Sequence, residues 1–398
     1  MLEISEVFNA AKVLGSVARH TPLVAAPKLS GDAEVWLKPE NLQLTGSFKL
    51  RGAYYKISQL SEEEKARGVI ACSAGNHAQG VALGATHSGI KSIICLPEGA
   101  PISKIEATKN YGAEVCLVPG VYDDAYARAL QLQKEHGYTF VHPFDDEKVI
   151  AGQGTIGLEI LNDMPDVEAV IVPVGGGGLI SGVAFAIKSL NPNVKVYGVQ
   201  AEGAASMVKS LQEGHRVHLD KVGTIADGIN VKEPGENTYA MCSKYVDDMV
   251  TVSDAETAAA ILALMENNKL VAEGAGAVSV AAVMFGKVPV KGKKVVCLVS
   301  GGNIDVNMVN RIIMRGLAKG GRIYKFDIRL DDKPGQLEGV CSVVAKLGGN
   351  VLRVNHDRLS NLQSFNDCVL HMELETRNKE HIATIRQGLL DSGFDVLN

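Results

Sequence analysis

AVIVPVGGGGLISG (169–182) joins an apolar run to the start of a helical pattern through four consecutive glycines. The run AVIVPV has no polar residue, as expected of a parallel strand that is covered on both faces. Four glycines leave bare backbone N–H groups at the start of the following helix, where a phosphate can bind. The spacing is neither G-x-G-x-x-G nor G-x-x-x-x-G-K-[ST], so the dinucleotide and P-loop classes are not indicated. A purely conformational role for the glycines stays open at this point.

Apolar runs of the same kind alternate with helical patterns from residue 66 to residue 300. The helical patterns include DDAYARALQLQKEHG (123–137) and DAETAAAILALMENNKL (254–270), whose apolar residues recur at helical spacing. This alternation predicts a doubly wound α/β sheet, in which ligands bind at the carboxyl ends of strands. The expected strands are GVIACS (68–73), KSIICLP (91–97), AEVCLVP (113–119), TFVHPF (139–144), AVIVPV (169–174), KVYGVQ (195–200) and KVVCLVS (294–300).

The pattern changes near residue 320, where LAKGGR (317–322) is typical of a linker. Beyond it, strand and helix patterns follow in the order strand, helix, strand, strand, helix and short strand. This order predicts a ferredoxin-like α+β domain at 322–398, preceded by a first domain at 1–320. The six segments are RIYKFDIRL, GQLEGVCSVVAKLGG, NVLRVNHDRL, DCVLHMELET, KEHIATIRQGLLDSG and FDVLN.

Composition excludes several classes of function for this chain of 398 residues. The net charge is −5 and no segment collects lysine or arginine into a stripe, so a nucleic-acid partner is not expected. No apolar run approaches the ~20 residues that span a membrane. The start, MLEISEVFNAAKVLG, lacks the basic region of a secretory signal, so we expect a cytoplasmic protein. The seven cysteines form no C-x-x-C; we interpret them as reduced, buried thiols and predict no metal site.

Three further segments place polar residues at the ends of apolar runs: TGSFKLRGA (45–53), SAGNHAQG (73–80) and SGGN (300–303). Together with GGGGL (175–179), and in this order, they resemble the motifs of the pyridoxal-phosphate enzymes of fold type II, above all the threonine ammonia-lyases (threonine dehydratases). The resemblance extends from Thr21-Pro22 to about residue 320. The tail resembles an ACT domain, including the D-x-P-G-x-L turn.

The resemblance implies a fold, a cofactor and a reaction. The fold would be two open, doubly wound α/β subdomains, with a smaller one, roughly 45–145, inserted in the larger, followed by the ACT domain. The cofactor would be pyridoxal 5′-phosphate. The activity would be that of a carbon–nitrogen lyase that converts L-threonine to 2-oxobutanoate and ammonia, and L-serine to pyruvate. A homodimer or homotetramer is expected, with a small-molecule amino acid as substrate and a second amino acid as effector at the ACT domain.

The resemblance also assigns roles to individual residues. Lys49 would form the Schiff base with the cofactor and remove the α-proton, while Phe48 packs beside the cofactor. Asn76 would hydrogen-bond the cofactor's 3′ oxygen, and Ser300 would face its pyridine nitrogen. The phosphate would be bound by Gly175, Gly176, Gly177, Gly178 and Leu179. The substrate carboxylate would be held by Ser73, Ala74, Gly75, Asn76 and His77. In this family the cofactor phosphate is the usual acid for the leaving hydroxyl, which would explain why no acidic side chain is evident beside Lys49.

Alternative functions come from the same fold and from another class. Serine racemases share most of these motifs, but the second residue of their S-x-G-N-H loop is a serine, and here it is Ala74. Their divalent-metal site is matched here by Glu202 without the paired aspartates. A remoter alternative is an amino-acid sensor with an inactive core. The preference for threonine or serine and the identity of the effector stay open; the turn DDKPGQL (331–337) and Asn350 are the expected effector contacts.

Overall fold

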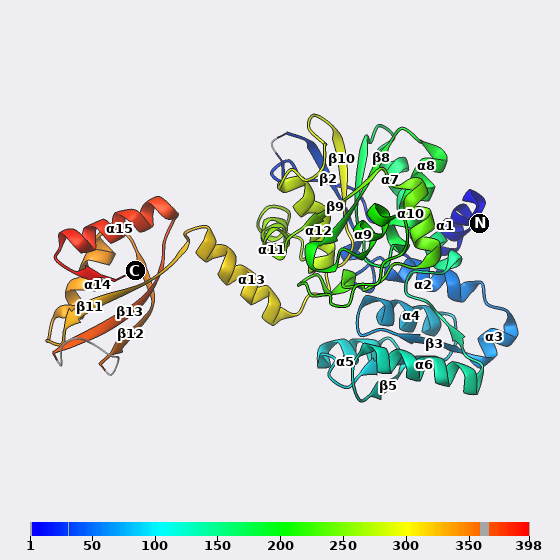
Figure 1. Ribbon diagram of the computed structural model, residues 1–398, viewed down its shortest axis with the longest axis horizontal. Helices are drawn as coiled ribbons and strands as arrows, with labels where there is room; N and C mark the ends of the chain where they lie inside the picture. Colours follow the sequence, from blue (N-terminus) through cyan, green and yellow to red (C-terminus); the bar gives the residue numbers. More distant parts are fainter. Residues whose placement is uncertain (1, 31, 359–365, 398) are drawn as a thin grey trace. The chain divides into compact units, whose positions relative to one another are not determined.

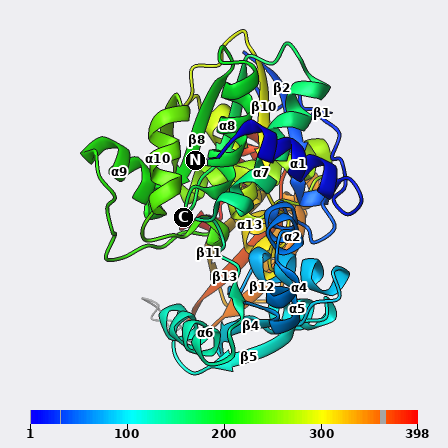
Figure 2. The same cartoon turned by 90° about the vertical axis from the view of Figure 1, so that its right-hand side faces the viewer.

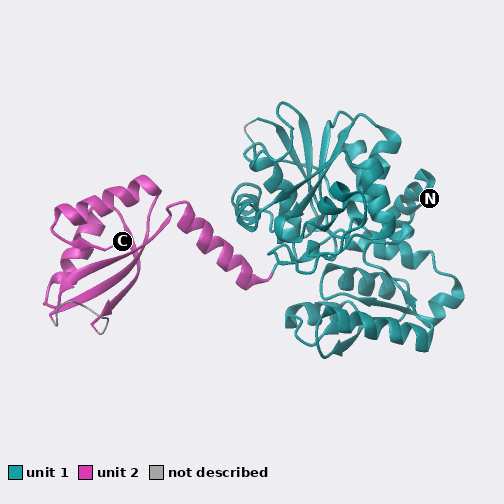
Figure 3. Ribbon diagram, in the orientation of Figure 1, with its two compact units in different colours: residues 1–304 teal, residues 305–398 magenta. Residues whose placement is uncertain are grey.

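The computed structural model describes residues 2–30, 32–358 and 366–397. It divides into two compact units, residues 1–304 and 305–398 (Figure 1, Figure 3). Leu359, the last residue of the expected strand NVLRVNHDRL, and Asn398, the last of FDVLN, lie outside the described residues. No helix in these ranges is long and apolar enough to cross a membrane.

Two sheets form the first unit, one above the other in both Figure 1 and Figure 2. The larger sheet has the order β1-β2-β10-β7-β8-β9, and all its neighbours are parallel except β1 and β2. Its strands are β1 Val24–Ala25, β2 Glu34–Pro39, β7 Ala169–Pro173, β8 Lys195–Ala201, β9 Asp248–Val252 and β10 Lys294–Val299. The smaller sheet is parallel throughout, in the order β5-β4-β3-β6. Its strands are β3 Val69–Cys72, β4 Ser92–Pro97, β5 Glu114–Val118 and β6 Thr139–Phe140.

Helices cover both sheets and bury their apolar residues. In the larger sheet every residue of β7 is buried, because α7 and α8 pack on one side and α12 on the other. The helices of the first unit are α1 Ile4–Leu14, α2 Lys49–Ser58, α3 Glu62–Arg67, α4 Asn76–His87, α5 Ile102–Asn110, α6 Tyr122–His136, α7 Glu147–Asp163, α8 Gly178–Leu190, α9 Ser206–Glu213, α10 Glu236–Tyr245, α11 Asp254–Ala263 and α12 Gly274–Met284. Short helical turns are η1 Glu40–Leu42, η2 Glu202–Ala204, η3 Asp227–Ile229 and η4 Leu264–Asn268.

The expected strands between residues 68 and 300 are all present, and they are parallel as predicted. The expected strand TFVHPF is shorter than predicted, because β6 ends at Phe140, and beyond it the Val141 N–H still donates to β3, to the Ile70 carbonyl at 2.9 Å. The structure adds β1, β2 and β9, which the sequence pattern did not predict. Charged residues interrupt the apolar pattern of β2 and β9. Lys38 is fully buried in β2, where ionic partners compensate its charge, and Asp248 is the first residue of β9.

The second unit has the predicted order of strands and helices around its own core. After helix α13, with which the unit begins, its elements are β11 Ile323–Asp331, α14 Gln336–Lys346, β12 Asn350–Asp357, β13 Asp367–Glu375, α15 Lys379–Asp391 and β14 Asp395–Val396. They form an antiparallel sheet in the order β12-β13-β11-β14. The predicted linker at 317–322 is wrong in part, because helix α13, Val306–Lys319, continues through its first three residues.

The two expected effector contacts of the second unit lie at opposite ends of its sheet. Asn350 pairs with Glu375 in the register, and its amide donates to that carboxylate at 3.1 Å. The turn DDKPGQL instead follows the other end of β11, where Asp331 pairs with Asp367. Eight residues of strand separate the two ends, roughly 25 Å. A single chain therefore does not bring this turn and Asn350 together.

Candidate active site

Lys49 is the first residue of α2, and the loop before it is bound to the end of β10. Ser47 forms an isolated bridge with Gly301, and the Phe48 N–H donates to the Ser300 carbonyl at 3.1 Å. Gly46 permits the tight turn with a φ of 70°. These contacts place the Lys49 side chain at the carboxyl ends of the strands, where the topology predicts a ligand.

The Lys49 amine is buried and donates to the Pro143 carbonyl at 2.6 Å. Burial lowers the pKa of Lys49 to about 8, although the nearby Glu273 carboxyl opposes this shift. The carbonyl of Pro143 is available because Pro143 lies beyond the end of β6. A lysine with this pKa has a substantial neutral fraction at neutral to mildly alkaline pH, as a base or a nucleophile requires.

Asn76, the first residue of α4, lies in a chain of polar contacts with Glu273 and Asn303. Its amide donates to Glu273 Oε1 at 2.6 Å, and its carbonyl oxygen accepts from Asn303 Nδ2 at 2.7 Å. Burial raises the pKa of Glu273 to about 7, and the Asn76 hydrogen bond acts against this rise. Because an amide has two N–H donors, one donor of Asn76 remains for a ligand. Gly301 completes the packing, since a Cβ there would lie 2.5 Å from Glu273 Oε1.

The loop 73–77 presents backbone N–H groups where β3 passes into α4. The Gly75 N–H donates to the Ser73 hydroxyl at 3.2 Å. The N–H groups of Ala74, Asn76 and His77 donate to no acceptor in the described ranges. Free N–H groups at a helix N-terminus favour an anion such as a carboxylate.

The His77 ring is fixed beside this loop in its neutral form. Its Nε2 contacts the Val141 carbonyl at 2.8 Å, and since a carbonyl only accepts, Nε2 carries the proton. Nδ1 is buried without a hydrogen-bond partner in the described part of the chain. Burial lowers the pKa of His77 to about 3, and the nearby Lys49 adds to this effect. The ring therefore offers a lone pair and not a charge.

The glycine loop between β7 and α8 is buried and its carbonyls are occupied. The Gly176 carbonyl accepts from the Thr238 hydroxyl at 2.6 Å, and the Gly177 carbonyl accepts from Ser181 N at 2.9 Å. In contrast, the N–H groups of 175–179 donate to no acceptor within the described residues. A Cβ on Gly176 would lie 2.5 Å from the Phe144 ring, and Gly177 has a φ of 99°. Side chains are thus excluded from a loop whose N–H groups lack acceptors.

These features fit pyridoxal phosphate. The glycine loop supplies several N–H groups at the N-terminus of a helix of 13 residues, which suits a phosphate. Lys49 supplies a buried amine of lowered pKa, and Asn76 supplies a free amide donor. Ser300 is buried at the end of β10, and its hydroxyl donates to the Ala275 carbonyl at 3.2 Å. The structure places all these predicted residues in the first unit at carboxyl ends of its strands, with Phe48 at 5.4 Å from the Lys49 amine (ring centroid to Nζ).

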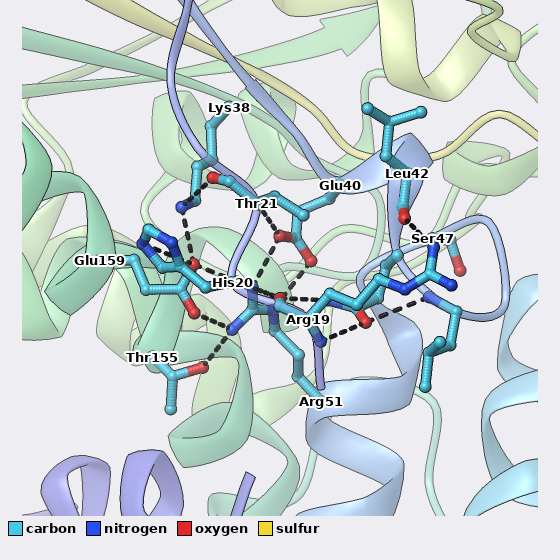
Figure 4. A network of polar contacts seen from close by, with 12 residues as sticks. Arg19, His20, Thr21, Lys38, Glu40, Leu42, Ser47, Arg51, Thr155 and Glu159 are labelled. Carbon is cyan, nitrogen blue, oxygen red and sulfur yellow. Dashed lines mark hydrogen bonds and ion pairs between the residues drawn. The ribbon is translucent and has the colours of Figure 1, made fainter. Parts of the chain in front are cut away.

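A buried ionic network lies behind the site and contacts the helix that carries Lys49 (Figure 4). Arg51 donates to both carboxylate oxygens of Glu40, each at 2.8 Å, and to Glu159 Oε1 at 2.6 Å. Lys38 donates to Glu159 Oε2 at 2.6 Å and to the Thr21 carbonyl at 2.6 Å. Arg51, Glu40 and Lys38 are each at most 1% exposed. The network connects α2 with β2, η1 and α7.

Sequence reasoning missed Glu273, Asn303 in its contact with Asn76, and the Arg51 network. Glu273 had one available signal: it is the only charged residue in the run LVAEGAGAVSVAAV (270–283). A charge in such a run is expected to be buried and to have a partner. The ionic network had no comparable signal, since its members are dispersed from residue 38 to residue 159.

Comparisons with known proteins agree with this geometry. The family described as pyridoxal-phosphate dependent enzyme matches residues 16–301. The L-threonine ammonia-lyase of Thermotoga maritima is 52% identical to this chain over 398 residues, which is 100% of this chain and 99% of that protein. The similarity thus includes the second unit as well as the first.

Two solved structures have the fold of the first unit. The processed form of threonine deaminase isoform 2 from Solanum lycopersicum is 42% identical with a TM-score of 0.73, covering 78% of this chain and 93% of that one. Maize serine racemase is 32% identical with a TM-score of 0.75, covering 80% of this chain and 98% of that one. The fold is therefore shared by eliminating and racemising enzymes, and residues in the site must distinguish them.

Proposed function

The chain belongs to the family of pyridoxal-phosphate-dependent enzymes and deaminates L-threonine to 2-oxobutanoate and ammonia; from this premise we propose the roles of its residues. The bound cofactor supplies a conjugated ring that withdraws electrons from the substrate Cα. The observation that carries the proposal is the buried amine of Lys49 in one site with a glycine loop whose N–H groups lack acceptors.

Lys49 is the residue that holds the cofactor covalently and then moves the substrate proton. Its amine must be neutral to take the proton from Cα, and burial favours the neutral form. The hydrogen bond to the Pro143 carbonyl fixes the amine in one direction. Lys49 therefore binds the cofactor in the resting enzyme and acts as general base once the substrate amine has replaced it.

The other residues orient the substrate and tune the ring. The loop 73–77 holds the substrate carboxylate through its free N–H groups, which sets the Cα–H bond toward Lys49. The N–H groups of 175–179 hold the phosphate. Ser300 would be a neutral partner for the pyridine nitrogen once its hydroxyl turns from the Ala275 carbonyl, to which it donates at 3.2 Å. A neutral donor does not enforce protonation of the ring, so prompt elimination is favoured over transamination.

Elimination removes the proton from Cα and the hydroxyl from Cβ, which leaves as water. The released enamine tautomerises to an imine, and one water molecule hydrolyses it to the 2-oxoacid and ammonia. By the same route L-serine gives pyruvate. Because the two substrates differ by one methyl group, worth only about 1 kcal/mol in a pocket, we propose that both are accepted.

A steady-state assay of oxoacid and ammonia release tests the proposed reaction. With L-threonine we expect equal amounts of 2-oxobutanoate and ammonia, and with L-serine equal amounts of pyruvate and ammonia. Each should depend on added pyridoxal phosphate after the cofactor is removed. Glycine and acetaldehyde as products would instead indicate cleavage between Cα and Cβ and would contradict the assignment.

Ala74 is the residue that distinguishes this enzyme from a serine racemase, and we predict that a serine at this position introduces racemisation. Ala74 is partly buried in the loop between β3 and α4, and its methyl group cannot transfer a proton. In Ala74→Ser a hydroxyl would stand on the substrate face opposite Lys49. We expect D-serine to become measurable by chiral chromatography, with some loss of elimination. If Ala74→Ser makes no D-serine while Ala74→Gly and Ala74→Ser lose elimination equally, the assignment of the two faces is wrong.

We propose that the second unit is a regulatory ACT domain that binds an amino acid, with isoleucine, valine and serine as the first candidates. Its order of elements is that of the ferredoxin-like fold, and β12 is an edge strand with exposed apolar residues Val351 and Leu352. Unpaired edges favour association, so a homodimer or homotetramer is the proposed assembly. The seven cysteines are all free thiols, which fits a reducing compartment such as the cytoplasm.

Removal of the part of the second unit that follows α13 tests this role. A chain that ends at Gly320 keeps the first unit and α13. We expect it to retain cofactor binding and elimination but to lose any response to the effector, and to form smaller oligomers. Allosteric coupling of this kind is usually a 5- to 150-fold change in apparent affinity, within reach of steady-state kinetics at several effector concentrations. If the truncated enzyme responds to the same effector with the same midpoint, the effector site lies in the first unit.

A further inference from the structure

Three metal-binding side chains converge at one end of the sheet in the second unit. Asp332 follows β11, His356 lies near the end of β12, and Cys368 lies at the start of β13. One ligand atom of each lies within 4.8 Å of the ligand atoms of the other two. The residues are 24 and 12 positions apart in the sequence, so no local motif indicated them.

The strand register explains why these side chains meet. Cys368 pairs with Leu330, two residues before Asp332, and His356 pairs with Leu370, two residues after Cys368. Because side chains two residues apart in a strand share a face, Cys368 and His356 lie on the same face of the sheet. Cys368 belongs to the apolar core there, whereas His356 is exposed on the edge strand β12. The backbone N–H of Asp332 donates to the Asn366 carbonyl at 2.7 Å, which holds Asp332 beside the start of β13.

The thiol of Cys368 is the buried centre of this cluster. Cys368 is fully buried, and its Sγ lies 2.8 Å from His356 Nε2 and 3.5 Å from the Leu330 carbonyl oxygen. The imidazole and the carboxylate are on the solvent side, since both residues are exposed. The apolar core therefore ends at a buried sulfur donor, Cys368, and the imidazole and carboxylate donors lie at its exposed edge.

We propose that Asp332, His356 and Cys368 bind a zinc-class divalent cation, and that a fourth coordination position is open. A thiolate with an imidazole and a carboxylate is a donor set that suits zinc. At zinc–ligand distances of about 2.0–2.3 Å a tetrahedral centre keeps its donors about 3.5 Å apart. The present separations lie on both sides of this spacing, with 2.8 Å between Cys368 Sγ and His356 Nε2 and at most 4.8 Å between any two of the ligand atoms. Binding releases the thiol proton of Cys368 to solvent.

The charges around the site suit a cation. The carboxylates of Asp331, Asp332 and Asp367 act electrostatically on the Cys368 thiol, and Arg358 acts against them. Arg358 contacts Asp332 at 3.0 Å and Lys333 pairs with Asp331 at 2.9 Å, so the carboxylates outnumber the cations. The Arg358 contact also orients the Asp332 carboxylate, as hydrogen bonds to metal ligands commonly do.

A bound cation would connect the ends of three strands with the turn that precedes α14. That turn begins at Asp332 and leads to Gly335, where the backbone has a φ of 90°. A metal bound at this site would stabilise the second unit. Its occupancy does not depend on the chemistry of the first unit, so its test is independent of the proposed function.

Equilibrium dialysis of the full-length, cofactor-loaded protein against Zn²⁺ tests the site. We expect one zinc per chain, and at least a hundredfold weaker binding in His356→Asn and Cys368→Ser, more than the 10- to 100-fold cost of losing an outer partner. Matched controls are His371→Asn, a histidine of β13 that instead contacts Asp327, and Cys341→Ser, a partly buried cysteine of α14. Both controls should bind zinc like the wild type.

Cobalt supplies a second measurement that identifies the sulfur ligand. Co²⁺ added to the holoenzyme should give thiolate and ligand-field bands in a difference spectrum, and Cys368→Ser should lack the thiolate band while Cys341→Ser keeps it. His356 is exposed on the edge strand β12, so the loss of zinc binding in His356→Asn cannot be attributed to unfolding of the core. The proposal is overturned if the wild type binds no zinc, or if zinc binding survives in both His356→Asn and Cys368→Ser.

Discussion

Lys49→Ala is expected to lose at least a hundredfold in kcat with L-threonine, because the substitution removes both the cofactor's attachment and the base. General-base catalysis alone contributes about 10²- to 10⁴-fold. The fold should survive, since the variant removes a buried cation whose pKa is already lowered by burial. Steady-state oxoacid release and the absorbance of the bound cofactor measure the two losses separately.

Two variants control this result. Lys49→Arg keeps a cation but cannot become neutral, so it should be as inactive as Lys49→Ala. Lys56→Ala, on the same helix and paired with Asp146 at 2.7 Å, should keep most of the activity. Retention of more than about one hundredth of wild-type activity by Lys49→Ala would exceed what a lost general base permits and would refute the role of Lys49.

Arg51→Met is expected to destabilise the first unit by about 3–5 kcal/mol, the cost of removing one partner from a buried ion pair. Its guanidinium is 1% exposed and contacts the carboxylates of Glu40 and Glu159. Without it Glu40 would be buried with the Thr21 hydroxyl, at 2.6 Å, as its only side-chain partner among the described residues. Urea unfolding monitored by circular dichroism measures the loss.

A matched control separates this effect from the loss of any ion pair. Lys65→Met breaks a surface pair with Glu62, whose side chain is 90% exposed, and should cost at most about 1 kcal/mol. The loss of stability in Arg51→Lys should lie between those of Arg51→Met and Lys65→Met, because lysine keeps the charge but loses the bidentate contact with Glu40. If Arg51→Met and Lys65→Met have the same unfolding midpoint, the network does not hold α2 in place.

The features that sequence predicted well are those with a strong local pattern. The strand AVIVPV and the four glycines after it are adjacent in the chain, so their physical consequence is visible without the fold. The parallel strands were predicted because residues buried on both faces must be apolar almost throughout. Motifs at strand ends, such as SAGNHAQG, could be assigned to one edge because parallel strands end on the same side.

The features that sequence missed depend on contacts between distant segments. Lys38 interrupts an apolar run, and only its partner Glu159, 121 positions later, explains why it is buried in a strand. Glu273 contacts Asn76, 197 positions earlier, so its raised pKa is a product of the fold. Helix α13 was missed at its end because LAKGGR contains two glycines that indicate a break, whereas the helix stops only at Lys319.

The position of the cofactor on the chain is the most direct test of the account. Borohydride reduction of the purified holoenzyme, followed by proteolysis and mass spectrometry, fixes the cofactor to the lysine that holds it. We expect the added mass on the peptide that contains Lys49, with loss of the visible absorbance and of threonine deamination in the same proportion. A modified peptide that lacks Lys49, or full activity after complete reduction, would contradict the central claim.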